Sequence, residues 1–189
     1  IVVTPAIPND HQELNFLRDK DYTILKRSQV LGLICGQHKS FAIAGTHGKT
    51  TTSSLLAHIF KFSGKEPVAF LGGITQNYLT NLLLPEKITD NTHVIVEADE
   101  YDRSFLTLFP DSAIITSTDP DHLDIYGSSE YMMESYNLFA SQVKEQGKLI
   151  VKKGLDVGET SATKKYTYAL DDSAADYYAK NKRVEDGYY

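Results

Sequence analysis

Short apolar runs alternate with longer amphipathic runs along most of this chain. Each short run has the length and the β-branched content of a buried strand. These runs lie at 41–44, 68–71, 93–97, 113–117 and 149–151. Two longer runs, 50–63 and 130–145, carry apolar residues three or four positions apart, which is typical of a helix with one buried face. Strands that alternate with helices predict an α/β fold with a mostly parallel sheet flanked by helices.

The apolar positions of the two expected helices identify the side chains that should face the sheet. In the first helix they are Leu55, Leu56, Ile59 and Phe62. In the second helix they are Met132, Met133, Tyr136, Leu138 and Phe139. We interpret the second set as core rather than as a cofactor site.

Residues 1–38 show a separate strand–helix–strand–helix pattern, and their own core would be small. We therefore expect them to be the closing part of an α/β domain, with a second domain over 39–189. The chain begins inside a strand-like run and ends just after a turn signal, so we expect it to be part of a longer protein.

The chain changes character after residue 152, where Tyr and Lys interleave. Tyr166–Leu170 is typical of a strand, and Asp186-Gly187 is typical of a hairpin turn. Interleaved Tyr and Lys can indicate nucleic-acid binding. Acidic residues in the same stretch favour a solvated antiparallel edge of the sheet instead.

Composition narrows the class of protein. The formal net charge of −6 argues against general nucleic-acid binding, which needs a basic face. Cys35 is the single cysteine, so no internal disulfide can form, and its apolar surroundings predict a buried thiol in a reducing, cytoplasmic setting. No stretch approaches the roughly 20 apolar residues that span a bilayer, so we expect no membrane partner.

A glycine-rich loop joins the first expected strand of the second domain to its first helix. Its candidate nucleotide-binding residues are Gly45, Thr46, His47, Gly48, Lys49, Thr50 and Thr51. Glycines let the backbone approach phosphate oxygens, and a helix N-terminus favours an anion. The loop is shorter than the usual phosphate loop, which has four residues between its glycine and the Gly-Lys pair. The alternative is a plain turn between a strand and a helix.

Acidic clusters follow two other expected strands. Glu97 opens the run 97–102, and His122 lies within the run 117–124. Because the carboxyl ends of parallel strands meet at one edge of a sheet, we expect both clusters on the side of the glycine loop. Carboxylate oxygens and an imidazole there could hold Mg²⁺ against a triphosphate. The alternative is that the acids only cap helix N-termini.

Three motifs in this order resemble the Mur ligase family. They are Gly45–Thr52 (GTHGKTTT), Val96–Asp102 (VEADEYD) with Ser104–Leu106, and Asp119–Tyr126 (DPDHLDIY). The resemblance covers nearly the whole chain. Residues 1–38 are similar to the end of the family's Rossmann-like N-terminal UDP-binding domain, and residues 39–189 to most of its central, P-loop-containing ATP-binding domain. The family's C-terminal domain is not represented.

The resemblance implies an ADP-forming amide ligase of peptidoglycan precursor synthesis. In this family ATP phosphorylates a substrate carboxylate, and an amino group attacks the acyl phosphate. Within the family the chain is most similar to the members that join L-alanine to UDP-N-acetylmuramate. These two substrates, with ATP and Mg²⁺ as cofactors, are therefore what the resemblance implies.

The resemblance also implies roles for individual residues. Lys49 would contact the ATP phosphates, and Thr50 and Glu97 would hold the Mg²⁺ that bridges the β and γ phosphates. His122 would ligate a second Mg²⁺ beside the acceptor carboxylate. Lys49, Glu97 and His122 are thus the catalytic candidates.

Other positions of the motifs carry weaker implications. His47 would face the substrate, and Asp99 and Asp102 would orient their loop. Ser117 stands where family members usually carry Asn.

Two alternatives remain open from the sequence. One is the recycling ligase that attaches a whole peptide to UDP-N-acetylmuramate and shares the EADEYD pattern, although Ser104–Leu106 followed by Pro110 favours the alanine-adding type. Folylpolyglutamate synthase is less similar. The other alternative is a P-loop module without ligase activity, which would not need Glu97 and His122 for a second metal.

Overall fold

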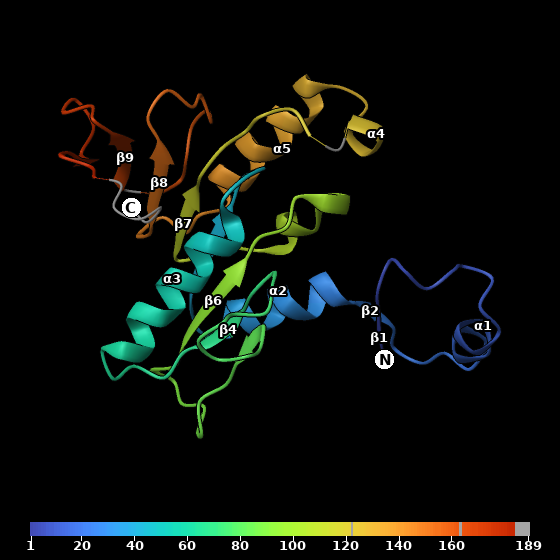
Figure 1. Ribbon diagram of the computed structural model, residues 1–189. Helices are drawn as coiled ribbons and strands as arrows, with labels where there is room; N and C mark the ends of the chain where they lie inside the picture. Colours follow the sequence, from blue (N-terminus) through green and yellow to red (C-terminus); the bar gives the residue numbers. More distant parts are fainter. Residues whose placement is uncertain (122, 163, 184–189) are drawn as a thin grey trace.

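The computed structural model describes residues 1–121, 123–162 and 164–183, without the side chains of 123 and 124. Its main feature is a twisted sheet whose strand order is β10-β9-β8-β7-β3-β6-β4-β5 (Figure 1). The strands are β3 Lys39–Ala44, β4 Val68–Phe70, β5 Leu82–Leu83, β6 His93–Glu97, β7 Ser112–Ile115, β8 Lys148–Lys152, β9 Lys164–Leu170 and β10 Tyr177–Ala179. The predicted α/β fold with a mostly parallel sheet is confirmed, since β4–β5 is the one antiparallel pair within the described residues.

The centre of the sheet is the apolar strand β3. It pairs in parallel with β6 on one side, where Ile43 lies opposite Glu97, and with β7 on the other, where Ala44 lies opposite Ile115. The chain therefore passes from one side of β3 to the other between β6 and β7. In parallel α/β sheets, such a reversal opens a crevice at the carboxyl ends of the strands.

Helices cover the sheet in two layers that follow from the alternation along β3. Ile43 points into one core with Ala57 of α3 (Lys49–Phe62). Ala42 and Ala44 point into the other core. That second layer contains α2 (Arg27–Gln37), the 3₁₀ helix η1 (Tyr101–Thr107) and α5 (Ser129–Ser141), with the short α4 (Leu123–Tyr126) beside α5. The loop before α3 thus emerges between two helical layers.

The buried face of α3 differs from the prediction. Ser53 and Ala57 are its buried residues, whereas Leu55, Ile59 and Phe62 are 57%, 60% and 86% exposed. Leu56 is partly buried and packs against this core as predicted, so the helical period was correct and the predicted face was rotated from the observed one. Small side chains one turn apart let the helix backbone lie close to β3 and β6, so Leu55, Ile59 and Phe62 face outward.

The predicted face of α5 is largely confirmed. Met132, Tyr136 and Phe139 are buried, but Leu138 is 51% exposed and does not belong to the core. Ser128 begins this helix as its N-cap, with a hydroxyl that accepts a hydrogen bond from the backbone N–H of Tyr131.

The first 26 residues form a small separate lobe that projects from the sheet (Figure 1). It contains β1 (Val2–Val3) and β2 (Leu25–Lys26), which pair in parallel, and α1 (Gln12–Asp19). The strand–helix–strand–helix order is as predicted. Helix α2 follows β2 directly and packs against the core of the main sheet, where Cys35 is buried and burial raises the pKa of its thiol to about 12. The division at 38/39 remains a prediction.

The predicted antiparallel edge after residue 152 is wrong. Strand β9 pairs in parallel with β8, and β10 pairs in parallel with β9. Between β9 and β10 the chain turns back, and the carboxylate of Asp176 accepts hydrogen bonds from the backbone N–H and the hydroxyl of Thr167 at 2.7 and 2.8 Å. These contacts place the start of β10 beside the middle of β9, with Tyr177 opposite Tyr168, so that the two strands run in the same direction. Strand β10 is nevertheless exposed at the edge, and Asp186-Gly187 lies outside the described residues.

The described part of the chain contains no helix with the length and hydropathy to cross a membrane.

Candidate functional site

The glycine loop leaves the carboxyl end of β3 and runs into α3. Gly45 and Gly48 have φ angles of +130° and +83°, which side chains disfavour. A Cβ on Gly45 would also collide with the Thr116 hydroxyl and the Ser117 backbone. No side chain of the described residues caps the N-terminus of α3. Its first N–H groups therefore remain free to meet an anion.

The end of β7 supports the loop from the neighbouring strand. The Thr116 hydroxyl donates to the carbonyls of His47 and Ala44 at 2.5 and 3.1 Å. The Ser117 hydroxyl accepts a hydrogen bond from the His47 backbone N–H at 2.7 Å, and it lies 2.9 Å from the Thr46 hydroxyl. Ser117, where Asn is usual in the family, thus holds the loop itself. The sequence analysis missed this support, although a strand parallel to β3 must end beside the loop.

The ammonium of Lys49 is fixed by two acceptors. It donates to the Gly45 carbonyl and to Oε1 of Glu100, both at 2.8 Å. The side chain of Glu100 is 1% exposed and that of Lys49 is 13% exposed. Glu100 was not among the predicted site residues. The feature of the sequence that could have identified Glu100 is its place in the acidic run after β6.

Glu97 lies where β6, α3 and the segment after β4 meet. Its Oε1 accepts a hydrogen bond from the Thr50 hydroxyl at 3.0 Å, and its Oε2 accepts one from the backbone N–H of Gly72 at 2.8 Å. A Cβ on Gly72 would collide with this carboxylate. The structure thus brings Glu97 beside Thr50, directly after Lys49.

The oxygen donors at this point suit Mg²⁺. A carboxylate and a hydroxyl 3.0 Å apart are hard ligands, and Gly72 leaves room for the carboxylate. Mg²⁺ usually takes one or two protein carboxylates and completes its shell with water and phosphate oxygens. In keeping with that sparse set, no group of three or more His, Cys, Asp or Glu side chains in the described residues forms a metal site.

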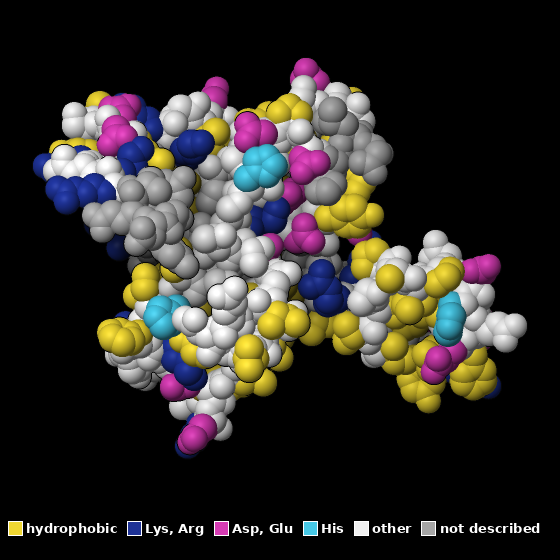
Figure 2. Space-filling view, in the orientation of Figure 1, with side chains coloured by type: hydrophobic (Ala, Val, Ile, Leu, Met, Phe, Trp, Pro, Cys, Tyr) yellow, Lys and Arg dark blue, Asp and Glu magenta, His cyan; other side chains and the backbone are white. Residues whose placement is uncertain are grey.

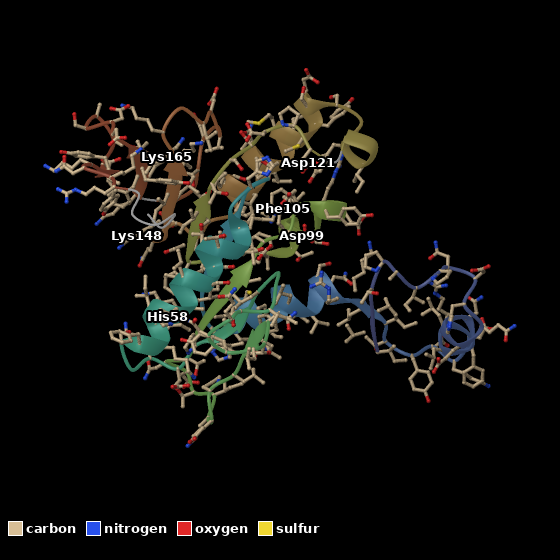
Figure 3. The ribbon with its side chains drawn as sticks, viewed as in Figure 1. His58, Asp99, Phe105, Asp121, Lys148 and Lys165 are labelled. Carbon is tan, nitrogen blue, oxygen red and sulfur yellow. The ribbon has the colours of Figure 1, made fainter. Side chains whose placement is uncertain are left out.

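The remaining predicted site residues lie around the loop with fewer contacts. The His47 imidazole is exposed, with Nε2 3.9 Å from Oδ2 of Asp119, and Thr51 is exposed in the first turn of α3. Figure 3 shows Asp99 and Asp121, which follow β6 and β7, on the loop side of the sheet. His122 lies outside the described residues, so its predicted role as a metal ligand stays a prediction.

The loop after Glu97 has the orienting contacts that the motif implied. Asp99 accepts a hydrogen bond from the backbone N–H of Tyr101 at 3.1 Å, and Asp102 lies 3.8 Å from the ammonium of Lys26. Asp102 and Arg103 have φ angles of +52° and +54°. Consecutive left-handed residues that are not glycine store strain and are common at functional sites. Acidic side chains and a histidine gather over this part of the surface (Figure 2).

A cavity of the described residues lies elsewhere. It has a volume of about 770 Å³ and lies over the uncovered face of β7 and β8, lined by Leu56, Ile114 and Ile150. Lys148, at the start of β8, marks the end of the sheet opposite Asp121 (Figure 3). The side chains that form hydrogen bonds around the glycine loop do not line this cavity. We therefore place the candidate site at the loop.

Comparison with known proteins shows the family of this chain. The model of the Mur ligase middle domain matches residues 43–188. The chain belongs to the Mur ligase family. The match begins on β3 and includes the loop, Glu97 and Glu100.

Named relatives show which ligases within the family this chain is similar to. The chain is 49% identical over 189 residues to the UDP-N-acetylmuramate–L-alanine ligase of Porphyromonas gingivalis, with 99% of this chain and 41% of the relative covered. The solved structure of UDP-N-acetylmuramate-alanine ligase MurC from Thermotoga maritima has a TM-score of 0.73 at 25% identity, covering 90% of this chain and 38% of that chain. This chain therefore spans about two fifths of the length of its curated relatives.

A peptide-adding member of the family also shares the fold. The ligase named MPL from Neisseria meningitides, which acts on UDP-N-acetylmuramate and L-alanyl-gamma-D-glutamyl-meso-diaminopimelate, has a TM-score of 0.78 at 20% identity. It covers 88% of this chain and 58% of that chain. At this identity the likeness shows the fold alone.

Proposed function

We propose that this chain is the central part of an ATP-dependent ligase that joins L-alanine to UDP-N-acetylmuramate through an acyl phosphate. The observation that carries the proposal is the hydrogen bond between Thr50 and Glu97 at the start of α3, beside the glycine loop in which Lys49 is fixed. The 49% identity to an alanine-adding ligase supports the choice of substrates. We assign residues 1–38 to the end of a UDP-binding domain and 39–189 to the ATP-binding domain, in a cytoplasmic enzyme.

The loop would bind the phosphates of ATP through backbone groups and one cation. The N–H groups at the start of α3 and the glycines at 45 and 48 suit phosphate oxygens. Lys49 would neutralise the charge that spreads over the transferred phosphoryl group. Catalysis of this kind depends on positioning and on charge already in place before the reaction.

The residues fit a Mg²⁺ ion at one position. Thr50 and Glu97 would hold it, and His122 is the proposed ligand of a second ion. Bound Mg²⁺ neutralises phosphate oxygens and orients them for transfer. The Gly72 N–H fixes the second oxygen of Glu97, which keeps the carboxylate turned toward Thr50.

The test is phosphate release by the full-length protein. We expect release only when ATP, Mg²⁺, UDP-N-acetylmuramate and L-alanine are all present, with amide product in equal amount. Turnover with the tripeptide but not with L-alanine would support the recycling ligase instead. ATP hydrolysis that is independent of both substrates would support a P-loop module and reject the proposal.

A further inference from the structure

A second glutamate lies behind the glycine loop, three residues beyond Glu97. Glu100 is 1% exposed, and its Oε1 accepts a hydrogen bond from the Lys49 ammonium at 2.8 Å. Its other oxygen, Oε2, has no hydrogen-bond partner among the described residues. A buried carboxylate needs a cation to offset the loss of hydration. Within the described residues that cation is Lys49.

The backbone of Glu100 is held from two directions. Its carbonyl accepts hydrogen bonds from the Tyr126 hydroxyl at 2.6 Å and from the Arg103 backbone N–H at 2.9 Å. Burial, and after it the negative charge of Glu100, raises the pKa of Tyr126 to about 12. Tyr126 therefore remains protonated and keeps donating. The backbone of Glu100 is thus anchored to α4 and η1, independently of the loop that its side chain contacts.

The contacts of Lys49 leave one donor unassigned. An ammonium group carries three N–H donors. The Gly45 carbonyl and Glu100 Oε1 take two of them, both at 2.8 Å. These two acceptors fix the nitrogen before any nucleotide arrives, and a third N–H remains for a phosphate oxygen.

We propose that Glu100 is a positioning residue, which holds the ammonium of Lys49 over the loop and does not itself touch the nucleotide. The proposal rests on the function proposed above. Buried ion pairs add little net stability compared with apolar residues of the same size. An ion pair at this place therefore indicates a role in fixing the position of one group, the Lys49 ammonium, which would contact the triphosphate.

The test is a double-mutant cycle in the full-length protein. We expect Glu100→Gln to lower kcat at least tenfold and to leave KM for UDP-N-acetylmuramate and for L-alanine within twofold. Because Glu100 acts through Lys49, adding Glu100→Gln to Lys49→Ala should cost no further turnover. Glu66→Gln is the matched control, since Glu66 pairs with Lys61 on an exposed surface at 3.4 Å; it should leave kcat unchanged.

Several results would overturn the proposal. They are an unchanged kcat in Glu100→Gln, or a loss that multiplies with that of Lys49→Ala. Melting curves show whether each variant is folded at the assay temperature. If Lys49→Ala is not, Lys49→Met, which keeps much of the side-chain volume and cannot donate to Glu100, takes its place in the cycle.

A binding measurement separates this proposal from the proposed function. Calorimetry of Mg-ADP with the full-length protein does not depend on amide formation. We expect the double variant to bind Mg-ADP at least as tightly as Lys49→Ala, because Glu100 has no contact of its own with nucleotide and its unpaired charge in Lys49→Ala repels the phosphates. Weaker binding by the double variant contradicts the positioning role, whereas failure of the wild type to form amide rejects only the proposed ligase activity.

Discussion

At the scale of single residues, the site depends on a carboxylate with both oxygens engaged. Glu97 accepts one hydrogen bond from Thr50 and one from the Gly72 N–H. The second contact turns the first oxygen toward the loop. A glycine is required at position 72 because any side chain there would occupy the space of the carboxylate.

Gly72→Ala should therefore displace Glu97 without unfolding the protein. We expect turnover of the full-length ligase to fall about tenfold or more, as for other losses of a prearranged contact. Gly73→Ala is the control, since its Cβ would meet only a Thr50 methyl at 3.4 Å, an ordinary contact. Equal activities of the two variants would contradict this reading of Gly72.

Removal of the charged groups themselves should have a larger effect. We expect Lys49→Ala or Glu97→Ala to lower turnover roughly a hundredfold or more, because Lys49 is the proposed cation at the phosphates and Glu97 is the proposed ligand of Mg²⁺. The measurement is kcat of the full-length protein at saturating ATP and Mg²⁺. Near-normal turnover in either variant would count against the assignment of the site.

The sequence predicted these residues unevenly. Lys49, Thr50 and Glu97 belong to motifs; the Thr50 hydroxyl donates to Glu97, whereas Lys49 donates to the Gly45 carbonyl and to Glu100. Glu100 and Ser117 were missed because their importance depends on which strand lies beside β3. That neighbour is a property of the sheet order and is not encoded in local spacing.

At the scale of elements, the parallel strands β3, β6 and β7 bring the motifs together at their carboxyl ends. At the opposite end of the sheet, Asp111 forms hydrogen bonds that link neighbouring segments. Asp111 Oδ2 accepts hydrogen bonds from the Ser40 backbone N–H and from the Lys144 ammonium, both at 2.9 Å. Burial opposes ionisation of this carboxyl. The hydrogen bonds and the charge of Lys144 outweigh that effect and hold the pKa of Asp111 below its ordinary value.

The sign of this shift predicts a pH dependence. A lowered pKa in the folded state adds stability above the ordinary carboxyl pKa of about 3.9, and this stability is lost as the pH falls through the lowered value. Asp111→Asn should lower the melting temperature at pH 7, since hydrogen bonds to a charged group contribute about 1.5–3 kcal/mol. The difference from the wild type should shrink near pH 3.

Asp172→Asn is the control for this prediction. Asp172 pairs with Lys153 at 2.6 Å, but the Asp172 side chain is 48% exposed, compared with 28% for that of Asp111. Such pairs contribute little, so the change in melting temperature at pH 7 should be smaller. A difference between wild type and Asp111→Asn that is as large at pH 3 as at pH 7 would contradict the account of Asp111.

The sequence did not predict which face of α3 is buried, or that β10 pairs in parallel at the edge of the sheet. In α3 the apolar period alone selected Leu55 and Ile59, yet Ser53 and Ala57 face the sheet. Close packing on β3 and β6 decides the phase, and a pattern of hydrophobicity contains no information about that distance. The parallel pairing of β10 likewise depends on Asp176, whose contacts are tertiary.

At the scale of the whole molecule, the candidate site lies at the carboxyl ends of the central strands. The surroundings of this site are partly open. The lobe of residues 1–26 buries little of its own surface, with Leu14 its buried apolar residue among those described. The uncovered face of β7 and β8 borders the cavity of about 770 Å³. Curated relatives are about two and a half times as long, since this chain covers 41% of one of them.

We therefore predict that the isolated 189-residue polypeptide binds Mg-ATP weakly at best and does not form amide. The reason is that this chain covers 41% of the length of a relative named as an alanine-adding ligase. The measurement is amide formation with both substrates, with the full-length protein as the positive control. Ligation by the 189 residues alone would overturn this prediction.

The most direct test of the central claim is a crystal structure of the full-length protein with an ATP analogue and Mg²⁺. The account predicts the triphosphate across residues 45–51, Lys49 hydrogen-bonded to a phosphate oxygen, and one Mg²⁺ at about 2.1 Å from oxygens of Thr50 and Glu97. It also predicts His122 at a second ion. A triphosphate bound away from the loop, or a Mg²⁺ that neither Thr50 nor Glu97 contacts, would contradict it.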